Sequence, residues 1–453
     1  MIASFALFAI DVGLLLAAWP LTVWFACHEA CPAHVWLQAL ALAGFNLAFL
    51  YALGLYRRES LSDTSAALGR IPLVVGMALA AGGIAGAALG QPLPSGLLIV
   101  AAACLGVCAL LARLIFLALR RHDMFRPRLL VIGAGPRAWD LMWVLRSQGR
   151  NLNYDVTFVH EDSFGPIDLR LADDPANRIV MSQGNLLAIA DELDADQIVV
   201  APDERRGMAL ESLITCRTAG YPVYQYMSFL EKEVGRIDIK RPDLNWVLYS
   251  EGFNNGPLTR ALKRGFDILG SLFILTCCLG MLLPAMRAVW LCDRGPIFYR
   301  QERVTLGGRR FHILKLRTMR TDAEKNGAVW AAAKDNRITP IGGFLRRTRL
   351  DELPQLINVL KGDMSLVGPR PERPEFIAEL AKQLPLYQER HAVKAGLTGW
   401  AQINYPYGAS LDDARSKLSF DLYYVKKCSL LFDLMIVMQT LRVVIWSGAA
   451  GAR

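Results

Sequence analysis

Four long apolar segments within the first 120 residues constrain this chain more than any other feature. They cover residues 2–27, 35–56, 71–90 and 96–112. About 20 apolar residues are enough for a helix to cross the hydrocarbon core of a bilayer. The whole chain of 453 residues is 53% hydrophobic and only 20% charged, whereas soluble domains carry about 25% charged residues. The sequence therefore predicts a membrane protein with four N-terminal spans, and it excludes a disordered chain.

Basic residues in the loops predict the orientation of these spans. The loop after the first segment contains no Lys or Arg, whereas the next loop contains Arg57, Arg58 and Arg70. Five arginines follow the fourth segment: Arg113, Arg120, Arg121, Arg126 and Arg128. Because cytoplasmic loops are enriched in Lys and Arg, we expect the N-terminus and everything after residue 113 to be cytoplasmic. The first segment lacks a basic flank, so a cleaved signal peptide is not expected.

A few polar residues interrupt the N-terminal region. Asp11 lies within the first segment and is expected near the membrane interface or in a helix-pairing contact rather than in a functional site. Cys27 and Cys31 lie on the predicted outer side, where a disulfide and a metal site both remain open.

A glycine-rich turn follows the membrane region. Gly133, Gly135 and Ala138 form a G-x-G-x-x-A pattern between a predicted strand and a predicted helix. Further strand-like runs occur at residues 156–159, 178–181, 197–201 and 221–224. Alternation of strands and helices predicts a Rossmann-like parallel sheet. Its turn either binds a nucleotide or serves packing alone. We favour packing, because no catalytic group accompanies the turn.

A second apolar run lies beyond a linker at residues 251–258. It covers residues 268–286 and contains Pro284, which bends or breaks a helix. Basic residues flank it on both sides: Lys263, Arg264, Arg287, Arg294 and Arg300. Since a full crossing would place one basic flank outside, we favour a bent, re-entrant helix over an ordinary fifth crossing.

Polar motifs dense in cations follow this run. They include Lys315-Leu-Arg317, Arg346-Arg347, the carboxylate pair Asp351-Glu352, and Gly368-Pro-Arg370-Pro. Guanidinium groups suit phosphate oxygens. A carboxylate among so many cations stays ionised and can act as a nucleophile or a metal ligand. The net charge of +9 is therefore assigned to membrane anchoring and phosphate binding, and a nucleic-acid partner is not expected.

In residues 258–446 the chain resembles the large monotopic phosphoglycosyl transferases, which are bacterial polyprenyl-phosphate sugar-1-phosphate transferases. Its C-terminal motifs, Asn404-Tyr-Pro-Tyr-Gly408 and Lys417 to Tyr424, are most similar to the branch associated with exopolysaccharide and exosortase systems. The resemblance implies a membrane α-helical four-span bundle, a Rossmann-like α/β middle domain and a mainly α-helical monotopic catalytic domain with a re-entrant helix. The expected boundaries are 1–120, 121–250, the linker 251–258, and 259–453.

The same resemblance implies a reaction and its residues. Asp351 would attack the sugar-linked phosphate of a UDP-sugar and release UMP, and polyprenyl (undecaprenyl) phosphate would then take the phosphosugar. Glu352 would bind Mg²⁺. Substrate phosphates would be bound by Lys315, Arg317, Arg346 and Arg370, and Pro284 would bend the re-entrant helix. The reaction would be the first membrane step of exopolysaccharide or related glycan assembly.

The chain departs from the usual family pattern at three positions. Arg349 replaces a small residue, usually Ser, two positions before Asp351. Thr305 replaces a Gly, and Ala395 replaces a Pro. The apolar run at residues 430–446 contains Asp433, Gln439 and Arg442, so we expect an interfacial helix rather than a spanning one.

The expected location is the bacterial inner (cytoplasmic) membrane, as a multi-pass protein in contact with lipid and with its catalytic domain on the cytoplasmic face. The sequence leaves two other functions as alternatives. A membrane-tethered nucleotide-sugar-modifying enzyme would need a Tyr-x-x-x-Lys pair, and residues 128–250 contain none. A non-enzymatic scaffold of a polysaccharide assembly complex would not require Asp351, Glu352 and the arginines together. The transferred sugar and a homo-oligomeric state are left open.

Overall fold

The computed structural model describes residues 2–27, 33–56, 67–121, 127–147, 154–182, 184–204, 210–239, 256–320, 337–405, 408 and 410–445. Cys31 and the linker at 251–255 lie outside the described residues. The chain forms two compact units, residues 1–234 and residues 235–453, and each is described by itself.

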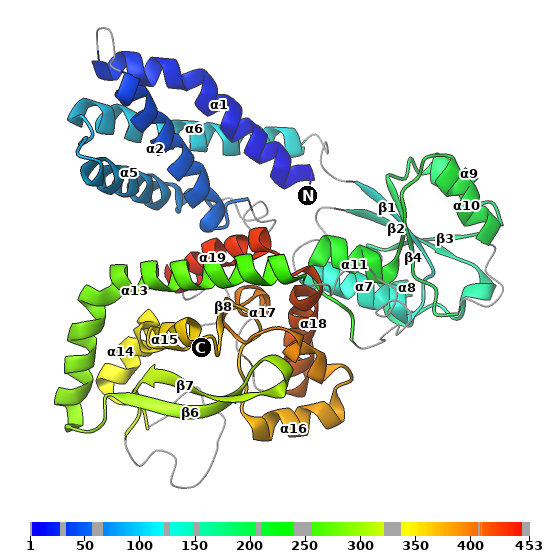
Figure 1. The fold of residues 1–453 in the computed structure, drawn as a ribbon. Coiled ribbons are helices and arrows are strands. Elements are labelled where there is room, and N and C mark those ends of the chain that lie inside the picture. Colours follow the sequence, from blue (N-terminus) through cyan, green and yellow to red (C-terminus); the bar gives the residue numbers. More distant parts are fainter. Residues whose placement is uncertain are drawn as a thin grey trace. The chain divides into compact units, whose positions relative to one another are not determined.

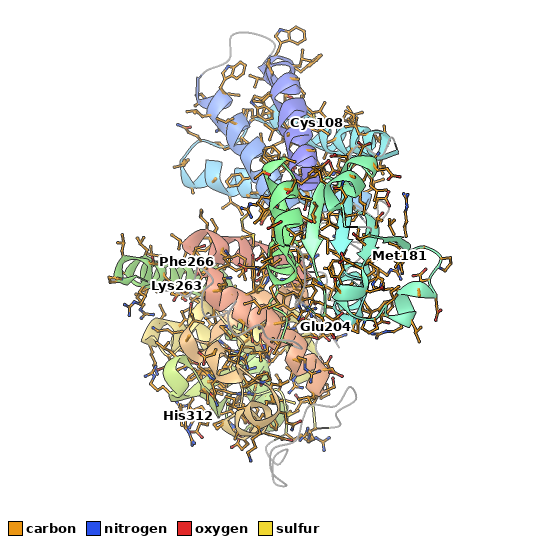
Figure 2. All side chains as sticks on the ribbon, turned by 90° about the vertical axis from the view of Figure 1, so that its right-hand side faces the viewer. Cys108, Met181, Glu204, Lys263, Phe266 and His312 are labelled. Carbon is orange, nitrogen blue, oxygen red and sulfur yellow. The ribbon has the colours of Figure 1, made fainter. Side chains whose placement is uncertain are left out.

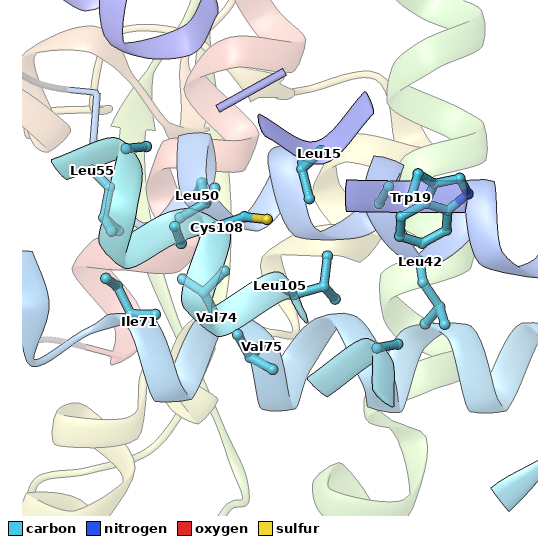
Figure 3. Close-up of a cluster of buried hydrophobic side chains, with 14 of the residues drawn as sticks. Leu15, Trp19, Leu42, Leu50, Leu55, Ile71, Val74, Val75, Leu105 and Cys108 are labelled. Atoms are coloured by element: carbon cyan, nitrogen blue, oxygen red, sulfur yellow. The ribbon is translucent and has the colours of Figure 1, made fainter. Parts of the chain in front are cut away.

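Four apolar helices form the N-terminal part of the first unit (Figure 1). They are α1 (Ile2–Cys27), α2 (Ala33–Ala52), α5 (Ile71–Ala88) and α6 (Ser95–Arg121). Each is long and apolar enough to cross a membrane, as is α13 in the second unit. Their interior is a cluster of buried side chains that includes Leu15, Trp19, Leu42, Val74 and Leu105 (Figure 3). Large apolar side chains also cover the outside of these helices, as expected for helices surrounded by lipid.

A buried ion pair joins α1 to α6. The Arg113 guanidinium donates to both Asp11 carboxylate oxygens at 2.6 and 2.7 Å, and the Tyr56 hydroxyl donates to Asp11 at 2.8 Å. The helix-pairing role predicted for Asp11 is confirmed. The fourth apolar segment was predicted to end at residue 112, whereas α6 continues to Arg121, and Arg113 inside it is only 3% exposed.

A five-stranded parallel sheet forms the rest of the first unit, in the order β3-β2-β1-β4-β5. Its strands are β1 (Arg128–Ile132), β2 (Asp155–His160), β3 (Arg178–Met181), β4 (Gln197–Val200) and β5 (Val223–Gln225). Its helices are α7 (Pro136–Ser147), α8 (Leu169–Ala172), α9 (Leu186–Glu192), α10 (Leu210–Thr218) and α11 (Tyr226–Val234). The parallel sheet predicted from the alternating pattern is confirmed.

The first helix described in the second unit is α13 (Pro257–Asp293), which has 37 residues and bends sharply (Figure 1). Pro284 lies inside it and cannot donate the hydrogen bond to the carbonyl four residues earlier, which is the usual cause of such a bend. Beyond the proline, Ala285 and Val289 pack in one cluster with Leu316 and Leu345.

Strands and shorter helices complete this unit. The strands are β6 (Phe298–Val304), β7 (Arg310–Leu316), β8 (Ser365–Val367) and β9 (Gly396–Thr398). The helices are α14 (Pro340–Thr348), α15 (Gln355–Lys361), α16 (Pro374–Gln383), α17 (Trp400–Asn404), α18 (Leu411–Lys427) and α19 (Leu430–Ile445). β6 and β7 form an antiparallel hairpin, and β8 and β9 form a parallel pair. Short 3₁₀ helices cover Leu306–Gly308, Leu350–Glu352 (η4) and Tyr387–Ala392 (η5).

Polar contacts fix the amino-terminal half of α13 to this unit. Lys263, which Figure 2 labels near Phe266, forms an ion pair with Asp433 of α19 at 2.5 Å and donates to the Val367 carbonyl. The three polar residues on which the prediction of an interfacial helix rested are all buried in α19: Asp433, Gln439 and Arg442. Their side chains lie in the protein interior, and the interfacial position of α19 itself stays a prediction.

Candidate active site

Asp351 and Glu352 lie on η4, the single turn between α14 and α15. Thr339 caps the start of α14, where its hydroxyl accepts a hydrogen bond from the Gly342 amide at 3.0 Å. The helix ends at Arg349, whose φ of 59° lies in the left-handed region. This reversal redirects the chain into η4 and sets the direction of both carboxylates.

Glu352 is the common partner of three cations. Its Oε1 accepts hydrogen bonds from Lys315 Nζ at 3.3 Å and Arg370 Nη2 at 3.2 Å, and it lies 3.8 Å from Arg349 Nη1. Burial alone would raise the pKa of Glu352, but these cations hold it well below its ordinary value. Glu352 is therefore ionised at neutral pH.

Asp351 has a different environment. Its side chain is buried, and among the described residues its Oδ1 has no hydrogen-bond partner. Burial raises the pKa of Asp351 to about 6, and the charge of Glu352 adds to the rise. Three nearby cations act in the opposite direction and lower the pKa of Asp351: Lys315, Arg346 and Arg349. A buried carboxylate oxygen without a donor is poised to react or to bind a cation, because no hydrogen bond has to be broken first.

Lys315 is positioned by the strand that carries it. Asn358 of α15 fixes β7, because its side chain accepts from the Leu314 amide and donates to the His312 carbonyl, both at 2.9 Å. Burial lowers the pKa of the Lys315 ammonium, and the charge of Glu352 opposes this. Asn358 thus links the helix that follows the carboxylates to the strand that supplies their cation.

Arg370 follows β8 and is held through its backbone. The Arg370 carbonyl accepts a hydrogen bond from Arg390 Nη2 at 3.0 Å, and the same nitrogen donates to Asp421 at 2.7 Å. Arg390 and Asp421 are almost completely buried. The sequence had given no role to either residue, because they lie on η5 and α18 and no short motif joins them.

The remaining predicted phosphate-binding residues occupy different places. Arg346 donates from Nε to the Thr318 hydroxyl at 2.9 Å and acts electrostatically on Asp351. Arg317 is buried against Gly295 in the turn between α13 and β6, where an added Cβ would lie 2.5 Å from its Nη1. The structure gathers Lys315, Arg346 and Arg370 around the carboxylate pair, whereas the contacts described for Arg317 lie at that turn.

Two of the three departures from the family pattern contact each other. The buried Thr305 hydroxyl accepts a hydrogen bond from the Ala395 amide at 3.1 Å and donates to the Asp363 carbonyl at 2.9 Å. A glycine at 305 would have no hydroxyl, and a proline at 395 would have no N–H. The two departures therefore compensate each other.

The described residues contain no cluster of three or more His, Cys, Asp and Glu side chains that could hold a metal ion. Mg²⁺ does not require one, since it usually binds one or two carboxylates together with substrate phosphates and water. The unpartnered Oδ1 of Asp351, beside the ionised Glu352, fits this type of site.

The glycine-rich turn of the first unit is filled by the chain itself. The Asp203 carboxylate accepts from the Arg137 amide at 3.2 and 3.3 Å, at the amino end of α7 where a nucleotide phosphate would bind. A Cβ at Gly135 would collide with this carboxylate. The small residue at 135 thus makes room for Asp203.

Comparison with known proteins shows to which family the chain belongs. The bacterial sugar transferase family matches residues 258–447. Over 243 residues the chain is 37% identical to the UDP-N-acetylgalactosamine-undecaprenyl-phosphate N-acetylgalactosaminephosphotransferase of Aeromonas hydrophila, covering 54% of this chain and 57% of that protein. Over 185 residues it is 40% identical to the UDP-glucose:undecaprenyl-phosphate glucose-1-phosphate transferase of Escherichia coli, covering 40% of each.

A longer match reaches beyond the second unit. The chain is 31% identical over 334 residues to the UDP-glucose:undecaprenyl-phosphate glucose-1-phosphate transferase of Klebsiella pneumoniae, which covers 71% of this chain and 68% of that protein. The chain belongs to the bacterial sugar transferase family.

Proposed function

We propose that this protein transfers a sugar-1-phosphate from a UDP-sugar to undecaprenyl phosphate and releases UMP. The observation that carries the proposal is the buried Asp351, whose Oδ1 has no hydrogen-bond partner among the described residues, beside the ionised Glu352. Four cations act on this pair: Lys315, Arg346, Arg349 and Arg370. Their surplus of two positive charges suits the two negative charges of a nucleotide-sugar diphosphate. The names of the relatives support the same pair of substrates.

The proposed reaction has two steps. An Asp351 carboxylate oxygen attacks the sugar-linked phosphorus, and the bond between this phosphorus and the bridging oxygen breaks, so that UMP leaves with the electron pair. The phosphate oxygen of undecaprenyl phosphate then attacks the same phosphorus, and the Asp351 carboxylate is released. Lys315, Arg346 and Arg370 hold the phosphate oxygens in both steps.

Glu352 would hold Mg²⁺ in this reaction. When bound, the ion would neutralise the charge that develops on the leaving phosphate. Glu352 also keeps Lys315 and Arg370 in place before a substrate arrives.

We also propose that α13 enters the membrane and returns to the same face. The bend in α13, its internal Pro284 and the basic residues on both sides support this (Figure 1). The protein would then lie in the bacterial inner membrane with residues 259–453 as the cytoplasmic catalytic domain, residues 1–120 as a four-span region and residues 121–250 as the Rossmann-like domain. The Asp203 carboxylate occupies the glycine turn, where a nucleotide phosphate would bind. We therefore propose that this turn serves packing within the Rossmann-like domain and does not bind a nucleotide.

A reaction that contains the UDP-sugar donor but no lipid acceptor tests the proposed function. Purified full-length protein with Mg²⁺ is mixed with UDP-glucose, UDP-galactose or their N-acetyl counterparts, and UMP is measured. The productive donor should release up to one UMP per active site and then stall until undecaprenyl phosphate is added, and intact mass should show a phosphosugar adduct. Turnover without an adduct, together with sequential kinetics, would replace the covalent route by direct transfer. Release of no UMP with any of these donors together with undecaprenyl phosphate would contradict the proposed function.

A further inference from the structure

Arg349 is a cation of the site whose role the motif pattern leaves unassigned. It occupies the residue where α14 ends, with a φ of 59° and a ψ of 13°. This left-handed conformation favours Gly and Asn and is costly for other residues. An arginine here therefore serves a purpose other than ending the helix.

The Arg349 side chain forms an ion pair with Glu352 but donates no hydrogen bond to it. Its Nη1 lies 3.8 Å from Glu352 Oε1, which is too far for a hydrogen bond. Lys315 and Arg370 already donate to that oxygen. No described residue accepts a hydrogen bond from the Arg349 guanidinium, whose side chain remains 39% exposed.

Two properties separate Arg349 from the other cations of the site. Lys315 is only 20% exposed on its side chain. Arg370, whose side chain is 36% exposed, donates a hydrogen bond to Glu352, and Arg346 donates one to the Thr318 hydroxyl. Arg349 thus has solvent access, donor groups that no described residue uses, and a place beside the carboxylates. These are the properties of a residue that binds an incoming anion.

We propose that Arg349 binds the diphosphate of the nucleotide-sugar donor and thereby sets donor affinity in this chain. The inference rests on the proposed function and assigns one more substrate-binding residue to the same site. The diphosphate is favoured over the single phosphate of the lipid, because its two phosphate groups can contact the less exposed Lys315 and the more exposed Arg349 at the same time.

Two substitutions separate charge from backbone conformation. Arg349→Asn removes the charge but retains a residue that tolerates the left-handed conformation. Arg349→Lys retains the charge. Arg347→Asn, which changes an exposed arginine of α14, is the matched control.

The test measures steady-state UMP release by the full-length enzyme while donor and lipid are varied separately. Arg349→Asn should raise the donor KM about tenfold or more, as expected for a lost hydrogen bond to a charged group, while the KM for undecaprenyl phosphate stays within about twofold. Arg349→Lys should recover most of the loss, and Arg347→Asn should match the wild type.

Three results would overturn the inference. They are an unchanged donor KM in Arg349→Asn, a rise confined to the lipid KM, and equal losses in the Asn and Lys variants, which would point to the backbone. A wild-type enzyme that releases no UMP would instead overturn the proposed function.

Discussion

The buried pair of Arg390 and Asp421 offers the sharpest link between stability and the active site. Their side chains are 6% and 3% exposed, and their charged atoms lie 2.7 Å apart. Asp421→Asn removes the negative charge and leaves the buried Arg390 guanidinium without its hydrogen-bonded carboxylate. Breaking a buried pair in this way costs about 3–5 kcal/mol. A unit of about 200 residues loses about 2–4 °C in Tm per kcal/mol, so the Tm of the catalytic unit should fall by about 6–20 °C.

Thermal unfolding of the purified full-length protein, followed by tryptophan fluorescence, measures this shift. The matched control is Asp412→Asn, which breaks an ion pair with Arg415 on the surface at a similar distance of 2.5 Å. Exposed pairs contribute about 0–1 kcal/mol, so this control should move the Tm by less than about 4 °C. Equal shifts in the two variants would refute the argument from burial.

A double variant isolates the effect on the site. Asp421→Leu with Arg390→Met replaces both charges by apolar side chains, which often restores stability. It still removes the hydrogen bond from Arg390 to the Arg370 carbonyl. We therefore expect a folded protein with a Tm near that of the wild type but with turnover reduced about tenfold, as for the loss of one hydrogen bond. Wild-type turnover in this variant would show that Arg390 does not position Arg370.

Further predictions concern the reaction, the folds and the topology. Asp351→Asn should abolish both turnover and the mass adduct, and Glu352→Gln should be severely impaired, with partial rescue by added Mg²⁺ in the UMP assay. Gly135→Ala should lower the Tm more than the turnover, because its methyl group displaces the Asp203 carboxylate; full loss of turnover at normal folded yield would contradict this. Thr305→Gly should destabilise by about 1 kcal/mol, and adding Ala395→Pro should recover part of that loss in a double-mutant cycle. Cysteines introduced at Asn254 and Ser447, both outside the described residues, should be labelled only from the cytoplasm.

The sequence was sufficient to find the residues of the site that belong to contiguous motifs. Asp351 and Glu352 are adjacent, and their motif predicted a compact carboxylate pair among cations. Arg317 could not be placed in the same way. The strand that carries Lys315 ends at Leu316, so strand alternation does not extend to Arg317, which packs against Gly295 instead.

Contacts between residues that are far apart in the chain could not be predicted from the sequence alone. Asp203 lies 66 residues from Arg137, and Arg113 lies 102 residues from Asp11. Nothing in the local sequence shows that Arg113 is buried, because only three-dimensional packing places the Asp11 carboxylate beside it. The presence of the helices and of the parallel sheet could be predicted from the sequence, because hydrophobic periodicity is a local property.

The charges of the site come from three separate segments that share one carboxylate. Lys315 lies on β7, Arg370 follows β8, and Arg349 ends α14, yet all three lie within 4 Å of Glu352 Oε1. Glu352 therefore holds together, before any substrate binds, the cations that a diphosphate would need. Such preorganisation spares the enzyme the cost of gathering like charges during the reaction. It follows that Glu352→Gln should disturb the site in two ways, through Mg²⁺ and through the repulsion of the released cations. Added Mg²⁺ can correct only the first, so rescue should stay partial at any Mg²⁺ concentration.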